Sequence, residues 1–138
     1  MQWQPNIRTE GDKQYVFCTW RRKFVRLTPE EWVRQHFLHL LVEDFAYPSP
    51  LIAVEMPLQD KRADAVVYSR SMKPLMLIEF KAETVPLTQL TLDQALVYNR
   101  RLGVPWLILA NGRSTIVAHC ENNNIRFINS IPPYGEIS

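Results

Sequence analysis

One segment of the chain carries hydrophobic residues at helical spacing. It spans residues 28–45, where Thr28 is suited to cap a helix, Pro29 takes the first helical position and Glu31 is placed to close a capping box. The apolar residues that share one face of this helix are Val33, Phe37, Leu40 and Leu41. The pattern predicts an amphipathic helix that ends before Tyr47.

Most of the remaining chain has β-strand patterns, and a second helical segment interrupts them. Residues 89–103 predict a helix that Gly103 ends. Strands are expected at residues 51–58, 64–69 and 75–82, at two positions within 104–120 that an Asn111-Gly112 turn joins, and at an edge formed by 125–131.

The order of these elements predicts a mixed α/β fold. The strand at 75–82, the helix at 89–103 and the strand at 104–110 form a right-handed βαβ unit with the two strands parallel. A chain of 138 residues fits a single domain. We divide residues 1–138 into an N-terminal hairpin at 5–27, which turns at Gly11-Asp12, a core at 28–128 and a Pro-rich tail at 129–138.

The formal net charge is only +2, so binding to nucleic acid would depend on local basic clusters. The candidates are Arg21-Arg22-Lys23 with Arg26, Lys61-Arg62 and Arg100-Arg101. Each of these could equally be a solvated surface, and we favour Lys61 and Arg62 as DNA contacts because they lie beside Asp64.

Several other classes of protein are disfavoured. The polar N-terminus is unlike a signal peptide, and no apolar run reaches the ~20 residues of a membrane helix, so no membrane partner is expected. Two widely separated cysteines are typical of reduced thiols, which favours a cytoplasmic location. His36 and His39 lack further zinc ligands at matching spacing and are expected on the surface.

The sequence LMLIEFKAE (75–83) places charges in an otherwise apolar strand. Glu79 and Lys81 point to one face because side chains alternate along a strand. If the strands at 64–69 and 75–82 pair symmetrically about their loop, Asp64 falls opposite Glu79, with Cβ atoms about 4.5–5.5 Å apart. Two such carboxylates repel each other, so either Mg²⁺ binds them or Lys81 joins them in a structural ion-pair cluster.

Three motifs carry a resemblance to a known family. RADAVVY, LIEFKA and QALVY, in this order, resemble the PD-(D/E)xK nuclease superfamily. Within it, the chain is most similar to the N-terminal nuclease domain of the motor subunit of type I restriction enzymes, over residues 21–112. Ala63 departs from the proline of the motif. The resemblance implies a restriction-endonuclease-like mixed sheet flanked by helices.

The resemblance also implies roles for individual residues. Asp64, Glu79 and the backbone carbonyl of Phe80 would bind Mg²⁺, with Mn²⁺ as a substitute, and Lys81 would activate the attacking water. Gln94 would contact DNA near Lys81. Further supporting candidates are Tyr98, Glu31 or its neighbour Glu30, and Glu55.

The residues leave alternatives open for several of these positions. Gln94 could instead form a capping box with Thr91, and Tyr98 could be an ordinary packed ring. A solvated strand face would explain Glu55 equally well.

The resulting hypothesis is a Mg²⁺-dependent deoxyribonuclease, an endonuclease domain of restriction type. The alternatives are a nucleic-acid-binding or assembly module that keeps the fold without turnover, and a purely structural domain. The expected partners are DNA and either a second copy of the chain or a larger restriction/helicase subunit.

Overall fold

A six-stranded mixed sheet forms the centre of the molecule in the computed structural model, which describes residues 2–58 and 61–138. The strands follow each other in space in chain order. They are β4 (Ile52–Leu58), β5 (Lys61–Tyr68), β6 (Pro74–Phe80), β7 (Trp106–Ala110), β8 (Thr115–Glu121) and β9 (Asn124–Ile128). Every pair is antiparallel except β6 and β7, so the predicted parallel βαβ pairing is confirmed.

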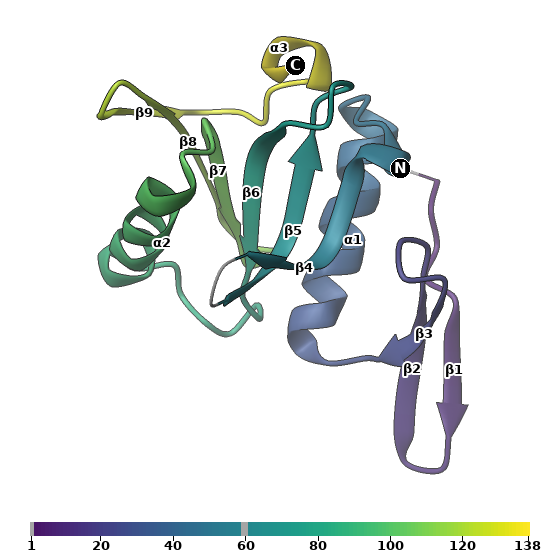
Figure 1. Ribbon diagram of the computed structural model, residues 1–138. Coiled ribbons are helices and arrows are strands. Elements are labelled where there is room, and N and C mark those ends of the chain that lie inside the picture. The colour runs from purple at the N-terminus through teal and green to yellow at the C-terminus, as the bar shows by residue number, and fades with distance from the viewer. Residues whose placement is uncertain (1, 59–60) are drawn as a thin grey trace.

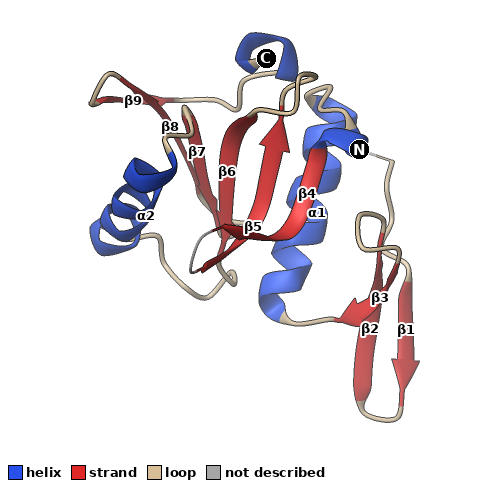
Figure 2. Cartoon of the chain, viewed as in Figure 1, coloured by secondary structure: helices blue, strands red, loops and turns tan. Residues whose placement is uncertain are grey.

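Two helices cover opposite faces of this sheet, as Figures 1 and 2 show. Helix α1 (Pro29–Asp44) packs on the face that carries Ile78 and Phe80, and α2 (Gln89–Leu102) packs on the face that carries Leu77. The alternation of β6 therefore supplies both cores, because both faces of this central strand are buried. Complete burial of one such aliphatic side chain contributes about 1.5–3 kcal/mol.

Both helix starts follow from local chemistry. Thr28 caps α1 through a hydrogen bond from the Glu31 backbone N–H to its Oγ1, at 3.0 Å. Helix α2 begins with a capping box formed by Thr88 and Thr91, so the alternative pairing of Thr91 with Gln94 is wrong. Gly103 ends α2 in the left-handed conformation, as predicted. No helix in the described part of the chain is long and apolar enough to cross a membrane.

The N-terminal segment is a small separate sheet of three strands. These are β1 (Ile7–Glu10), β2 (Lys13–Cys18) and β3 (Lys23–Arg26), and they pair in that order. The predicted hairpin with its Gly11-Asp12 turn is confirmed, because Glu10 pairs with Lys13. The third strand was missed, since Arg22 adopts a left-handed conformation that returns the chain after only four residues.

The predicted turn at Asn111-Gly112 is wrong. The connection between β7 and β8 has four residues, because Ala110 pairs with Thr115. The Asn111 side chain accepts hydrogen bonds from the backbone N–H groups of Arg113 and Ser114, which shapes the longer loop.

The two-residue turn lies instead at residues 122–123, between β8 and β9. Asn122 and Asn123 both have positive φ, at 50° and 65°. This conformation is the one that a tight hairpin requires. The predicted edge strand is confirmed as β9, with a shorter extent.

The C-terminal segment is part of the main core. The short helix α3 (Tyr134–Ile137) buries Tyr134 and Ile137 in the cluster under α1. The Tyr47 hydroxyl donates to the Pro132 carbonyl at 2.8 Å, and the Tyr134 hydroxyl donates to the Tyr68 carbonyl at 2.9 Å. A 3₁₀ turn (Ser49–Leu51) follows Tyr47 and leads into β4.

His39 is buried, so its expected surface position is wrong. Its ring stacks on Trp3 with centroids 4.1 Å apart and contacts Trp20 at 4.8 Å. Burial lowers the pKa of His39, because desolvation disfavours the charged ring.

Candidate active site

The structure brings Asp64 and Glu79 together across β5 and β6. Ala65 pairs with Ile78 and Val66 pairs with Leu77, and this register places Asp64 opposite Glu79. The register expected from the sequence is therefore confirmed at this end of the hairpin, whereas a bulge between Val67 and Tyr68 makes the pairing asymmetric near the loop. Val66 and Leu77 both belong to the cluster under α2, so the two carboxylates project on that face of the sheet.

The two carboxylates differ in their surroundings. Glu79 is 8% exposed, whereas Asp64 is half-buried. One oxygen of Asp64, Oδ2, accepts a hydrogen bond from the Phe80 backbone N–H at 2.8 Å. This bond orients the Asp64 carboxylate against β6.

Helix α1 contributes Glu30 to this site. Burial raises the pKa of Glu30, and the negative charge of Asp64 raises it further. Arg34 and Lys81 act in the opposite direction on the same group, so Glu30 lies within electrostatic reach of Asp64 and Lys81. Lys81 directly follows β6, where its backbone N–H donates to the Ala110 carbonyl at 3.0 Å.

The supporting role considered for Glu31 does not fit its position. Its carboxylate is buried and binds Arg21 at 2.6 Å and Gln35 at 3.0 Å, away from the helix N-cap. Only the Thr28 half of the expected capping box is present. Glu30, which the sequence offered as the alternative, is the residue of α1 whose pKa responds to the charges of Asp64 and Lys81.

Arg34 links α1 to the strands that carry the site. Its guanidinium is buried, donates to the Asp64 backbone carbonyl at 3.0 Å and pairs with Glu55 at 3.2 Å and with Glu31 at 3.4 Å. The solvated-face interpretation of Glu55 is wrong, because this residue interrupts the ladder between β4 and β5 with φ at 57° and turns to Arg34. No sequence signal singled out Arg34, since a lone arginine on a helix has no diagnostic spacing.

The donor chemistry of the site suits a hard cation. Asp64, Glu79 and the Phe80 carbonyl offer oxygen atoms only, and Mg²⁺ commonly takes one or two carboxylates and completes its shell with water and phosphate. Across residues 2–58 and 61–138, no three or more His, Cys, Asp or Glu side chains are grouped so that they could hold a metal ion. A site here would therefore depend on two carboxylates rather than a full protein cage.

The remaining predicted residues lie in different surroundings. Tyr98 is buried in the cluster under α2, and Gln94 is exposed on the same helix. Arg62 is exposed near the start of β5, and the Lys61 side chain lies outside the described residues. The DNA-contact roles of Gln94, Lys61 and Arg62 stay predictions.

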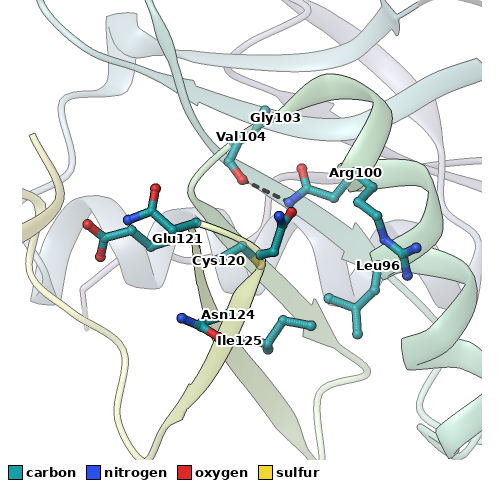
Figure 3. A pocket seen from close by; sticks show the side chains of 11 residues that line it. Leu96, Arg100, Gly103, Val104, Cys120, Glu121, Asn124 and Ile125 are labelled. Atoms are coloured by element: carbon teal, nitrogen blue, oxygen red, sulfur yellow. Dashed lines mark hydrogen bonds between the residues drawn. The ribbon is translucent and has the colours of Figure 1, made fainter.

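A cavity of about 490 Å³ lies away from this site, between the C-terminal end of α2 and the β8–β9 hairpin. Figure 3 shows Arg100 and Cys120 on its walls and the hydrogen bond from the Asn99 amide to the Val104 carbonyl, at 2.8 Å. Burial raises the pKa of the Cys120 thiol, which disfavours the reactive thiolate. No motif in the sequence pointed to this cavity.

The fold and the site define a mixed α/β domain with two opposed carboxylates and a neighbouring lysine. The family described as type I restriction enzyme R protein N terminus matches residues 29–132. The chain belongs to this family. The predicted likeness to the N-terminal domain of type I restriction enzyme motor subunits is thereby confirmed, and membership of the PD-(D/E)xK superfamily stays a prediction.

A solved structure shows the same fold. It is a fragment described as an HsdR subunit of a type I restriction enzyme from Vibrio vulnificus YJ016, and the superposition gives a TM-score of 0.59 at 17% sequence identity. The match covers 80% of this chain and 24% of that chain, so this chain spans about a quarter of its length. No curated protein matches the sequence.

Proposed function

We propose that this chain is the endonuclease domain of a restriction-type enzyme and hydrolyses DNA phosphodiester bonds with a divalent metal ion. The observation that supports the proposal is the register that sets Asp64 opposite Glu79, with Lys81 directly after the same strand. Membership of the restriction enzyme R family supports the same activity.

Each residue has a distinct task in this proposal. Asp64 and Glu79, with the Phe80 carbonyl, would hold Mg²⁺ or Mn²⁺, which would supply Lewis-acid activation of water and screening of the phosphate charge. The hydrogen bond from the Phe80 N–H keeps the Asp64 carboxylate in place before the ion arrives. Lys81 orients the attacking water and counters the charge that develops on the phosphate.

The surrounding residues would hold DNA and place the domain in a larger assembly. Lys61, Arg62 and Gln94 are proposed contacts to the phosphate backbone. Because the chain belongs to the type I restriction enzyme R family, we propose that it works with a larger restriction/helicase subunit or as a homodimer.

A cleavage assay tests the proposal. Purified protein is incubated with plasmid and with single-stranded DNA in Mg²⁺, Mn²⁺ or EDTA, beside Asp64→Asn, Lys81→Ala and a control, Asp93→Asn, on the exposed face of α2. Asparagine still accepts a hydrogen bond from the Phe80 N–H, so Asp64→Asn keeps the local fold. We expect metal-dependent nicking by wild type and the control, and none by the two site variants.

The alternatives predict different outcomes. DNA binding without nicking in either metal would favour a binding or assembly module that keeps the fold. If the wild type neither binds nor nicks, and Asp64→Asn raises the unfolding temperature, the site is a structural ion-pair cluster.

A further inference from the structure

The three-stranded sheet at residues 7–26, here called the basic arm, carries a net positive charge, whereas the rest of the molecule is net negative. It contains six basic and two acidic residues, a formal charge of +4, whereas the rest of the chain has ten basic and twelve acidic residues, a formal charge of −2. Figure 1 shows the arm projecting from the body beside the N-terminal end of α1. The arm lies outside residues 29–132, to which the family likeness extends.

One face of the basic arm combines arginines with aromatic rings. The register places Tyr15 between Arg8 on β1 and Arg26 on β3, and it places Phe17 opposite Phe24. Cross-strand neighbours lie about 4.5–5.5 Å apart, so the two arginines flank Tyr15 closely. This face therefore carries Arg8 and Arg26 next to the aromatic side chains of β2 and β3.

The aromatic rings hold this face in shape. Phe17 and Phe24 pack edge to face with centroids 5.4 Å apart, and the Arg8 guanidinium lies over the Phe24 ring at 4.2 Å. Since the Arg8 guanidinium lies over the Phe24 ring, this ring positions the cation. The arrangement suits contact with phosphates.

The opposite face of the basic arm is covered by the body. Val16 and Cys18, which alternate with Tyr15 and Phe17 along β2, are 1% and 0% exposed. Arg21 also turns inward, where it pairs with Glu31. The arm is thus fixed to the domain by one face and presents the other.

The remaining cations of the basic arm are exposed. They are Arg8, Lys13, Arg22, Lys23 and Arg26. In the part of the chain that the structure describes, none of the five forms an ion pair. Cations without ion pairs that are gathered on a projecting element attract a polyanion locally, although the net charge of the whole molecule is small.

We propose that the basic arm binds the phosphate backbone of DNA without reading its sequence and holds the substrate beside the Asp64–Glu79 site. The inference deepens the proposed function and rests on DNA being the partner. Each phosphate that a lysine or arginine neutralises releases counterions, so this binding would weaken steeply with salt.

The test measures binding in EDTA, where no metal-dependent cleavage occurs. Fluorescence anisotropy follows a labelled duplex and a labelled single strand of unrelated sequences at several salt concentrations. The arm variants are Arg8→Gln/Arg26→Gln and Arg22→Gln/Lys23→Gln. The matched control is Lys73→Gln/Arg126→Gln, which removes two exposed charges from the β5–β6 loop and β9.

We expect each arm variant to reduce the slope of log K against log salt on the duplex by about two, and the control to leave it unchanged. Arg22 lies in the turn before β3, and Lys23 pairs with Cys18 on the side of the sheet opposite to Phe17 and Phe24, so this variant separates charge from the packing of the aromatic rings. Arm variants that fold and bind as the control does, or a wild type that binds neither probe at low salt, would overturn the inference. If wild type cleaves DNA but the arm variants bind DNA as the control does, the inference about the arm fails and the proposed function stands. If binding depends on the arm but wild type does not cleave DNA in Mg²⁺ or Mn²⁺, the proposed function fails and the inference about the arm stands.

Discussion

Replacement of Arg34 should lower the free energy of unfolding more than any other single charge change on α1. Arg34 is 4% exposed and contacts the Asp64 carbonyl, Glu55 and Glu31 at once. Arg34→Met keeps the length and packing of the side chain but removes every one of these contacts. The change thus removes the Arg34 cation from the carboxylates of Glu31 and Glu55.

The size of the expected loss in stability follows from the two ion pairs that Arg34 forms, with Glu55 and with Glu31. Breaking a buried ion pair costs about 3–5 kcal/mol. The Glu55 side chain is 31% exposed, so water can solvate its carboxylate once Arg34 is gone. Glu31 still forms its ion pair with Arg21. The lower end of the range therefore applies. We expect a loss of about 3 kcal/mol, a shift of roughly 1–2 M in the urea midpoint for a domain of this size.

Equilibrium urea unfolding, followed by circular dichroism, measures this loss. Arg113→Met is the matched control, because its side chain is 70% exposed and its ion pair with Glu83 spans 4.0 Å. The control should change stability by less than about 0.5 kcal/mol. A loss in Arg34→Met no larger than in Arg113→Met would refute the reasoning. A double-mutant cycle with Glu55→Gln then apportions the coupling between Arg34 and Glu55.

Two further predictions concern stability away from the site. Because burial lowers the pKa of His39, the unfolded chain binds a proton more readily than the folded one, so stability should fall as the pH drops below about 6.5. In thermal unfolding between about pH 7.5 and 5.5, His39→Phe should lose less stability than wild type. An equal pH dependence in the two proteins would contradict the prediction. Gly112→Ala should cost about 1 kcal/mol or more, since φ is 88° and the added Cβ would meet the Glu83 Cγ at 3.1 Å, whereas Gly135→Ala meets nothing within 4 Å; equal urea midpoints for the two variants would refute this account.

The sequence predicted the central part of the fold because short-range patterns determine it. The alternation of side chains along β5 and β6 puts Asp64 and Glu79 on one face, and Gly103 ends α2. These features depend on residues close together in the chain. Local propensity and the pleat of a strand therefore suffice to predict them.

The side of α1 that faces the site could not be predicted in the same way. Glu30 and Glu31 are neighbours on a helix, and the inward position of Glu31 depends on its ion pair with Arg21, which lies in the turn between β2 and β3. The four-residue loop at Asn111 depends on side-chain hydrogen bonds rather than on the Asn-Gly pattern. A contact with a distant segment decided the first outcome, and local side-chain hydrogen bonds decided the second.

A titration of Mn²⁺ into the metal-free protein, followed by calorimetry, tests the central claim most directly. If Asp64 and Glu79 converge on one ion, wild type and Asp93→Asn should bind a single Mn²⁺, and both Asp64→Asn and Glu79→Gln should lose that binding while remaining folded. Unchanged Mn²⁺ binding in the two site variants, or no binding in wild type, would contradict the account.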